Sequence, residues 1–416
     1  MITVVGTGTG APLAPEAAAA VAGARLVVGG RRHLEAAPVP ADAERVVLGA
    51  LGPALDVIER HVDKRSPVVV LASGDPGFFG IVRVLAERFG AEALDVRPGV
   101  SSVATAFARL GLTWDDAVVV SAHGRALRTA VNVCRARPKV AVLTGPGAGP
   151  AELGAALDGY ARVLVVASAL GSPEERVERV TPAEAAGRDW GAAVSVVLCL
   201  DESRVLGAVR TVAGAPAGPA GWALDEAEFA HRDSMITKFE VRALALARLG
   251  PRQGELVWDV GAGSGSVAVE CARFGAAVTA VEKAPDGVER IRANAVAHGV
   301  DVRVVHGEAP GALSGLDDPD AVFVGGGGRE LPAVVAACAA RARRTVVVAM
   351  AALDRVPAAR AALTGAGFDC DGVLVQSSRL APLPGDVTRL AATNPVFLLW
   401  GVRNPVRPVY REGVAQ

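Results

Sequence analysis

A short apolar strand that runs directly into a glycine-rich turn is the feature that most limits the fold of this chain. The strand is Leu256–Val260, the turn holds Gly261, Gly263 and Gly265, and a helix-compatible segment begins at Ser266. Glycine adopts positive φ without a steric cost and lets a ligand approach the backbone closely. A strand, a glycine turn and a helix in this order predict a βα unit of a parallel sheet whose turn binds a nucleoside cofactor.

Two acidic residues flank this turn. Asp259 lies near the strand tip, where its carboxylate would face a cationic aminoacyl sulfonium, and Glu282 ends the next strand about 20 residues downstream, where a carboxylate accepts ribose hydroxyl protons. The turn lacks the final Gly or Ala of the dinucleotide fingerprint, with Val267 near that point, and this favours S-adenosylmethionine over NAD. A purely structural turn would leave both acids unexplained.

The second half of the chain repeats the order strand then helix, which predicts an α/β, doubly wound, Rossmann-like sheet. A polar, helix-compatible segment, Asp225–Leu249, precedes the first strand. The later predicted strands are Ala277–Val281, Val302–His306, Ala321–Val324, Thr345–Ala349, Gly372–Val375 and Val396–Trp400.

The first half is also α/β, with much of its sheet parallel, but it does not resemble the second. The predicted strands are Ile2–Val5, Leu26–Val28, Val46–Leu48, Val68–Leu71, Leu94–Val96, Val118–Ser121, Lys139–Leu143, Arg162–Val166 and Ser195–Cys199. A stretch rich in Gly, Ala and Pro follows, and this composition predicts a linker. We therefore expect a domain at 1–212, a linker at 213–224, a second domain at 225–405 and a tail at 406–416.

Charge and composition narrow the function classes. The net charge of -1 argues against a nucleic-acid partner, which would need a basic face. No apolar run is long enough to span a bilayer, and the N-terminus has no signal-peptide pattern, so we expect a cytoplasmic enzyme that does not enter membranes. The five cysteines lie far apart without metal-ligand spacing; buried thiols and no metal site are expected.

The turn with its two acids resembles the first motif of class I methyltransferases. Residues 232–242 and the glycines from Gly325 onward resemble the corrin C15-methyltransferase and decarboxylase family. The resemblance implies that the Thr-Lys-x-Glu-Val-Arg segment beginning at Thr237 lies beside cofactor and substrate. From helical spacing we expect Lys238 and Arg242 to pair with substrate carboxylates and Glu240 to orient a neighbour; a solvated amphipathic helix is the alternative.

One position departs from this family. Its fifth-strand motif usually carries Asn, but Ala349 stands at the equivalent place, so the hydrogen bond of that amide is missing or is supplied elsewhere. The turn at Asn394 fits the family.

Five ordered segments of the first half resemble the tetrapyrrole (class III) methyltransferases, with the C5-methylating corrin enzymes as the subfamily. They are Ala72–Gly80, Arg97–Val103, Ser121–Arg125, Leu143–Pro146 and Leu170–Arg176. The resemblance implies two α/β subdomains.

It also implies a cofactor held by a set of loop residues: Gly74, Asp75, Ser101, Ser102, Thr144 and Gly145. Asp75 is equally compatible with a simple Asp-Pro turn. His123 and Arg125 lie at a strand end where an anionic substrate would dock, although a hydrogen-bonded loop histidine is the plainer interpretation of His123.

The pairing of these families implies cobalamin biosynthesis: methyl transfer from S-adenosylmethionine, with S-adenosylhomocysteine as product, to C5 and C15 of precorrin-6Y. Loss of the ring C acetate carboxyl then gives precorrin-8. We expect a small-molecule tetrapyrrole substrate and a homo-oligomer. The alternatives are an S-adenosylmethionine-dependent RNA methyltransferase, a nicotinamide-dependent oxidoreductase, or a non-catalytic protein with decayed sites.

Overall fold

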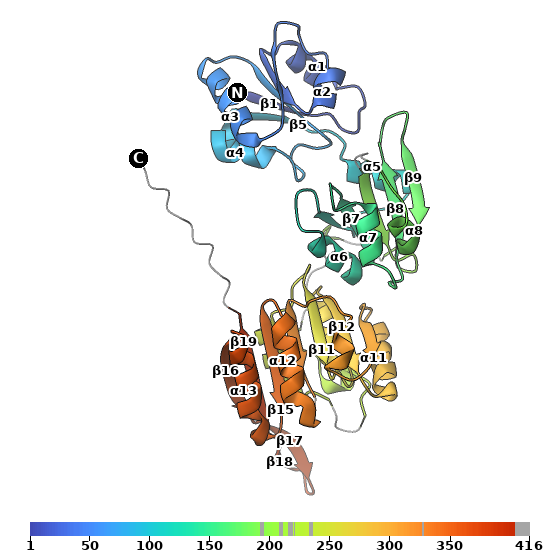
Figure 1. Ribbon diagram of the computed structural model, residues 1–416, viewed down its shortest axis with the longest axis vertical. Coiled ribbons are helices and arrows are strands. Elements are labelled where there is room, and N and C mark those ends of the chain that lie inside the picture. The colour runs from blue at the N-terminus through green and yellow to red at the C-terminus, as the bar shows by residue number, and fades with distance from the viewer. Residues whose placement is uncertain are drawn as a thin grey trace. The chain divides into compact units, whose positions relative to one another are not determined.

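The computed structural model describes residues 1–191, 195–207, 211–214, 219, 221–232, 236–326 and 328–403. Its internal contacts divide the chain into two compact units, one of residues 1–127 and 138–215 and one of residues 128–137 and 216–416 (Figure 1). We call them unit 1 and unit 2. The expected tail at 406–416 and residues 215–218 and 220 of the expected linker lie outside the described residues.

The first sheet of unit 1 is parallel throughout and has the order β3-β2-β4-β1-β5. Its strands are β1 (Ile2–Gly6), β2 (Leu26–Gly29), β3 (Glu44–Val47), β4 (Val68–Ala72) and β5 (Leu94–Arg97). Successive residues of β2 enter different core clusters, so apolar side chains pack on both faces of the sheet. The associated helices are α1 (Pro15–Ala22), α2 (Arg31–Ala36), α3 (Leu51–Asp63) and α4 (Val82–Phe89).

The second sheet of unit 1 has the order β6-β7-β10-β8-β9, and within it only β6 and β7 pair in parallel. The strands are β6 (Val118–Ser121), β7 (Lys139–Leu143), β8 (Val163–Ser168), β9 (Arg176–Val180) and β10 (Ser195–Leu200). The helices of this region are α5 (Ser102–Leu110), α7 (Pro150–Ala156) and α8 (Pro182–Ala186), whereas α6 (Leu127–Ala136) belongs to unit 2 from Arg128 onward. Two sheets confirm the expected two-subdomain fold, whereas the edge strand β9 was not predicted.

Unit 2 contains a seven-stranded sheet of order β13-β12-β11-β14-β15-β19-β16, in which β19 runs antiparallel to both neighbours. Its strands are β11 (Leu256–Val260), β12 (Ala277–Glu282), β13 (Arg303–His306), β14 (Ala321–Val324), β15 (Thr345–Met350), β16 (Asp369–Val375) and β19 (Val396–Val402). Core clusters fill both faces. This arrangement confirms the doubly wound, Rossmann-like prediction.

The helices of unit 2 are α9 (Phe239–Leu249), α10 (Ser266–Arg273), α11 (Pro285–Ala297), α12 (Leu331–Arg341) and α13 (Val356–Gly365). Among its described residues, the segment Asp225–Leu249 is therefore α-helical only from Phe239, after a short 3-10 turn at Glu226–Glu228. Lys238 is the N-cap of α9, with extended backbone. The expectation of a continuous helix through Lys238 is wrong, because that residue precedes the first helical turn.

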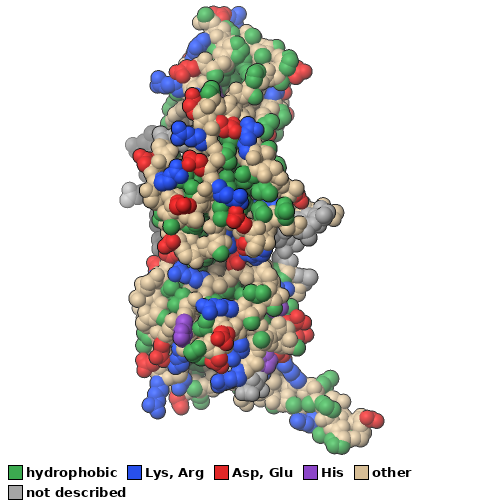
Figure 2. Space-filling view, turned by 90° about the vertical axis from the view of Figure 1, so that its right-hand side faces the viewer, with side chains coloured by type: hydrophobic (Ala, Val, Ile, Leu, Met, Phe, Trp, Pro, Cys, Tyr) green, Lys and Arg blue, Asp and Glu red, His purple; other side chains and the backbone are tan. Residues whose placement is uncertain are grey.

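A hairpin that was not predicted, β17 (Ser378–Leu383) and β18 (Val387–Ala392), projects from unit 2 (Figure 2). Leu380 and Leu390 lie opposite one another across it and are 78% and 67% exposed. Elsewhere on the face in Figure 2, basic and acidic side chains are interspersed. Within the described ranges, no helix has the length and apolar character needed to cross a membrane, and no cluster of metal-ligating side chains occurs.

Candidate active site

The glycine turn of unit 2 adopts the backbone that the sequence predicted. Gly261, Gly263 and Gly265 have φ of +74°, +58° and +72°. A Cβ on Gly261 would lie 3.1 Å from the nitrogen of Gly326, and one on Gly265 would lie 2.9 Å from the side chain of Ile291. A Cβ on Gly263 would meet no atom within 4 Å. The outer two glycines therefore serve packing, and the central one leaves open space.

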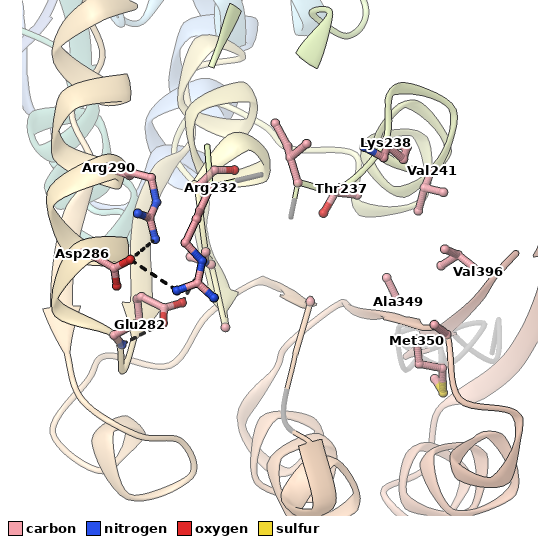
Figure 3. Close-up of a pocket in the computed structure, with 18 residues that line it drawn as sticks. Arg232, Thr237, Lys238, Val241, Glu282, Asp286, Arg290, Ala349, Met350 and Val396 are labelled. Carbon is pink, nitrogen blue, oxygen red and sulfur yellow. Dashed lines mark hydrogen bonds and ion pairs between the residues drawn. The ribbon is translucent and has the colours of Figure 1, made fainter. Parts of the chain in front are cut away.

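A cavity of about 420 Å³ opens beside this turn (Figure 3). This volume falls in the range of small-molecule sites. The lining comes from the segment before α9 and the first turn of that helix, the glycine turn, the ends of β12, β14 and β15, and the starts of α11 and β19. The lining residues are Arg232, Ile236, Thr237, Lys238, Val241, Gly261, Ala262, Gly263, Ser264, Glu282, Ala284, Asp286, Arg290, Gly325, Ala349, Met350, Ala351 and Val396.

Charged side chains gather at one end of the cavity (Figure 3). Glu282 is 9% exposed, and its two oxygens accept hydrogen bonds from the backbone nitrogens of Gly263 and Ala284 at 2.8 and 2.9 Å. Asp286 pairs with Arg290 at 2.9 Å and lies 3.8 Å from Arg232. Backbone donors thus fix the Glu282 carboxylate at the cavity wall, ready to accept from hydroxyl groups.

The other end is mostly apolar, with Val241, Met350 and Val396 labelled in Figure 3. Ala349 lies here, so the position where the related family carries Asn does face the cavity. Thr237 and Lys238 also line the cavity, and Lys238 lies near Val241 (Figure 3). The cavity therefore combines hydrogen-bonding groups for a polar ligand with an apolar wall for a second, less polar one.

Asp259 does not line the cavity. It is 1% exposed, and one carboxylate oxygen accepts from the backbone nitrogen of Ala268 at 2.9 Å in the first turn of α10. Its other oxygen has no hydrogen-bond partner among the described residues. Burial raises the pKa of Asp259 from 3.8 to about 7, and the neighbouring Glu282 charge adds to this effect. The expected direct contact of Asp259 with a sulfonium cofactor stays a prediction.

We expect Asp259→Asn to become more stable relative to the wild type as pH rises from 5 to 8. The folded pKa lies above the unfolded one, so the folded chain keeps a proton that the unfolded chain loses, and stability falls as pH rises through about 7. Asn keeps the acceptor for Ala268 but does not ionise. Urea unfolding across this pH range measures the difference, and a pH-independent difference would contradict a titrating Asp259.

Arg242 lies inside unit 2 and not at the cavity. Its side chain is fully buried, its guanidinium donates to the carbonyl oxygens of Thr237 at 2.6 Å and of Leu224, and it lies 3.4 Å from Glu270. These partners contradict the expectation that Arg242 and Lys238 together face substrate carboxylates. Its role is to tie the segment before α9 to α10.

Glu240 also has a structural partner. Arg379 on the β17–β18 hairpin binds Glu240 at 2.7 and 3.0 Å and Glu226 at 2.8 and 2.9 Å. Glu226 in turn accepts from the backbone nitrogen of Phe239 at 2.8 Å. Hydrogen bonding to Arg379 lowers the pKa of Glu226 to about 2. The hairpin is thereby fastened to the start of α9, and the expected orienting role of Glu240 in catalysis stays a prediction.

For Arg379→Gln we expect a stability loss that is constant above pH 5 and shrinks as pH falls from about 4.5 to about 2. The folded pKa of Glu226 is depressed, so its stabilisation is present above its ordinary value of 4.5 and is lost as the carboxylate becomes protonated. Denaturant unfolding at several pH values measures the loss. Arg389→Gln, an exposed arginine on β18, is the control, and an equal pH response there would refute the assignment.

The loops of unit 1 are packed backbone against backbone. A Cβ on Gly99 would lie 2.6 Å from the carbonyl oxygen of Gly74 and 2.7 Å from the nitrogen of Gly8, and one on Gly6 would lie 2.5 Å from the nitrogen of Gly99. Gly74 itself has φ of +60°. The loops after β1, β4 and β5 therefore meet at the carboxyl edge of the first sheet, where open α/β sheets bind ligands.

Three side chains among the residues singled out in unit 1 have local hydrogen-bond partners. Asp75 accepts from the backbone nitrogen of Gly77 at 2.7 Å, as an Asp-Pro turn requires. Ser101 caps α5 by accepting from Ala104, and Ser102 begins that helix. His123 lies 3.3 Å from the carbonyl oxygen of Thr144.

Gly145 has no room for a side chain there. A Cβ on it would lie 2.9 Å from the His123 ring. Cofactor binding by these residues remains a prediction.

Comparison with known proteins defines the class. Residues 1–186 match the family model for tetrapyrrole (corrin/porphyrin) methylases, and residues 227–401 match that for the precorrin methyltransferase domain. The chain thus joins two methyltransferase domains. A Sinorhizobium precorrin-6Y C(5,15)-methyltransferase (decarboxylating) is 41% identical over 342 residues, covering 79% of each chain. The chain belongs to the family of precorrin-6Y C5,15-methyltransferases (decarboxylating).

Single-domain relatives match each half separately. A Salmonella typhimurium cobalt-precorrin-7 C(5)-methyltransferase is 36% identical over 210 residues, 49% of this chain and 100% of the relative. A probable cobalt-precorrin-6B C(15)-methyltransferase (decarboxylating) of Pyrobaculum calidifontis is 38% identical over 170 residues, 39% of this chain and 87% of the relative. The two halves therefore correspond to enzymes that occur as separate chains.

Sequence reasoning missed several cavity residues. Ser264 lines the cavity, whereas the predicted Ser266 and Gly265 do not. Asp286 and Arg290 were also overlooked, although their spacing of four in the helix after Glu282 is a usable signal. Arg232 belongs to the segment 232–242 that resembles the C15-methyltransferase family, but its spacing did not indicate that it lines the cavity.

Proposed function

We propose that this chain methylates a precorrin-6Y-type tetrapyrrole at C5 and C15 and removes the carboxyl group of the ring C acetate, giving precorrin-8 in cobalamin biosynthesis. Membership of the C5,15-methyltransferase family carries this proposal. We assign C5 methylation to unit 1 and C15 methylation with decarboxylation to unit 2. The separate single-domain relatives support this division, since each is named for one of these positions.

S-adenosylmethionine is the proposed methyl donor, and the cavity of unit 2 fits it. A Cβ on Gly263 would meet no atom, so the turn leaves room for a ligand against its backbone, and the fixed carboxylate of Glu282 is placed to accept from ribose hydroxyls. Gly261, Gly325 and Thr237 complete the proposed contacts from the surrounding wall. S-adenosylhomocysteine would be retained by the same groups after the reaction.

The cofactor supplies an electrophilic methyl group on a sulfonium, whose departure leaves a neutral thioether. Residues of this cavity have to hold the macrocycle carbon in line with that methyl group, and such positioning contributes roughly 7–11 kcal/mol to lowering a barrier. The apolar wall at Val241, Met350 and Val396 excludes water from a flat, conjugated substrate. Lys238 is the cationic side chain of the Thr-Lys-x-Glu-Val-Arg segment that lines the cavity, and we assign it to a substrate carboxylate.

In unit 1 we assign cofactor binding to the loops that meet at the carboxyl edge of the first sheet. Gly74, Asp75, Ser101 and Ser102 belong to these loops. Thr144 and Gly145 follow β7 in the second sheet. A cytoplasmic location, a homo-oligomeric state and the absence of a nucleic-acid partner remain further proposals; sedimentation velocity tests the second.

Incubation with S-adenosylmethionine and precorrin-6Y, followed by mass spectrometry, tests the function. The expected product carries two additional methyl groups and has lost one carboxyl group as carbon dioxide. A product without new methyl groups would refute the proposal.

Gly74→Val tests the independence of the two sites. A β-branched residue at φ of +60° is strained and would displace the loop, so C5 methylation should stop while unit 2 still methylates C15. Loss of both reactions in a folded variant would show that the two sites are not independent.

A further inference from the structure

The loop after β4 exposes two adjacent aromatic rings. Phe78 and Phe79 are 38% and 50% exposed, and their rings meet edge to face with centroids 5.0 Å apart. Burial of such a side chain stabilises a folded protein, and these two rings give up much of that stabilisation. Gly74 and Asp75 lie in the same loop, but the cofactor contacts proposed for them do not explain why the two rings are exposed.

The backbone of this loop is built to hold Phe79 outward. Phe79 has φ of +55°, a region that bulky residues rarely occupy. Before it, the Asp75 side chain accepts from Gly77, and the Asp75 carbonyl accepts from Phe78 at 3.2 Å. After it, a Cβ on Gly80 would lie 2.3 Å from the Pro76 carbonyl oxygen, so the chain must turn there. Strain of this kind persists where function requires the conformation.

A cation from the second sheet of unit 1 lies over the same ring. The Arg125 guanidinium, in the loop after β6, is 5.8 Å from the Phe79 centroid, close to the limit of about 6 Å for a cation–π contact. Among the described residues its guanidinium has no ion-pair or hydrogen-bond partner. The exposed Phe79 ring and the exposed Arg125 guanidinium therefore lie next to each other, and each can contact a further group.

We propose that Phe79 and Arg125 form the docking face for the substrate of unit 1, a conjugated macrocycle that bears carboxylates. The ring offers an apolar, planar surface to the macrocycle, and the guanidinium pairs with a peripheral carboxylate. Phe79 is in the loop that holds Gly74 and Asp75, so the docked macrocycle lies beside the proposed cofactor loops. The inference rests on the proposed function and adds the residues that select its substrate.

The Phe79→Gly variant of the full chain distinguishes a loss of substrate binding from a loss of stability. Glycine relieves the positive φ, so the melting temperature should stay unchanged or rise by about 2–4 °C. The KM of precorrin-6Y for C5 methylation should nevertheless rise by about tenfold, the contribution of one stacked ring. Arg65→Gly is the matched control, because Arg65 is exposed in the turn after α3 and has φ of +54°. It should gain stability and keep its KM.

Arg125→Gln tests the charge. We expect its KM to rise by about tenfold with precorrin-6Y, and we expect no difference from the wild type when the peripheral carboxylates are methyl esters. An unchanged KM in Phe79→Gly, or an Arg125 effect that persists with the ester, would overturn the inference. Failure of the proposed function has a different signature, namely that the wild-type chain adds no methyl group to the macrocycle.

Discussion

Replacing Arg242 with methionine is expected to lower the free energy of unfolding of unit 2 by about 3–5 kcal/mol, a larger stability effect than for any other residue of its motif. Arg242 and Glu270 are both fully buried. Without the guanidinium, Glu270 keeps a single charged partner among the described residues, Arg273 at 2.7 Å. The carbonyl oxygens of Thr237 and Leu224 would also lose their donor.

Thermal unfolding of the full chain measures this loss, and Lys238→Met is the control within the same motif. Lys238 lines the cavity, so its replacement should slow C15 methylation and carbon dioxide release, and it should lower the unfolding transition less than Arg242→Met does. The opposite pattern, a stable Arg242→Met variant with a raised KM, would return Arg242 to the substrate site.

Glu282→Gln is expected to lower kcat/KM for C15 methylation by about 100-fold without changing C5 methylation. Two charge-assisted hydrogen bonds at about 1.5 kcal/mol each give this magnitude. The carboxylate is held by the backbone nitrogens of Gly263 and Ala284. A Gln amide group would present its own N–H to one of these donors, so the side chain would lose its fixed position as well as its charge.

Calorimetric titration with S-adenosylhomocysteine supplies a second measurement. Two sites are expected for the wild-type chain and one for Glu282→Gln. Asp286→Asn removes a neighbouring carboxylate from the same wall and should retain both sites. Equal binding by Glu282→Gln and the wild type would exclude Glu282 from cofactor recognition.

The fold could be predicted wherever buried strands are runs of apolar residues. Leu256–Val260 and Val68–Ala72 are of this type, and their glycine-rich loops were placed correctly. The strand β9 (Arg176–Val180) was missed because charged residues interrupt its apolar ones at the edge of a sheet. The β17–β18 hairpin was not predicted because its leucines are exposed, so its sequence lacks the pattern of a strand that packs against a core.

The site was harder to predict, because the expectation that Lys238 and Arg242 share one helix face assumed a helix that begins before Lys238. Lys238 and Arg242 lie four residues apart, but Lys238 is an N-cap with extended backbone, and the two side chains go to different environments. Arg242 is buried and pairs with Glu270. Because Glu270 lies far from Arg242 in the sequence, no local pattern indicated this pair. Similarly, Arg379 reaches Glu240 from the hairpin, a contact that no local pattern encodes.

The position of β19 has a consequence for synthesis of the protein on the ribosome. This strand lies between β15 and β16, yet it follows both in the chain. Until Val396–Val402 has emerged, β15 has an open edge with buried-type residues such as Val347, and β16 has no partner in the sheet. Open apolar edges recruit other chains. A nonsense mutation just before Val396 would therefore produce an aggregating polypeptide, even though the glycine turn and Glu282 had already been translated.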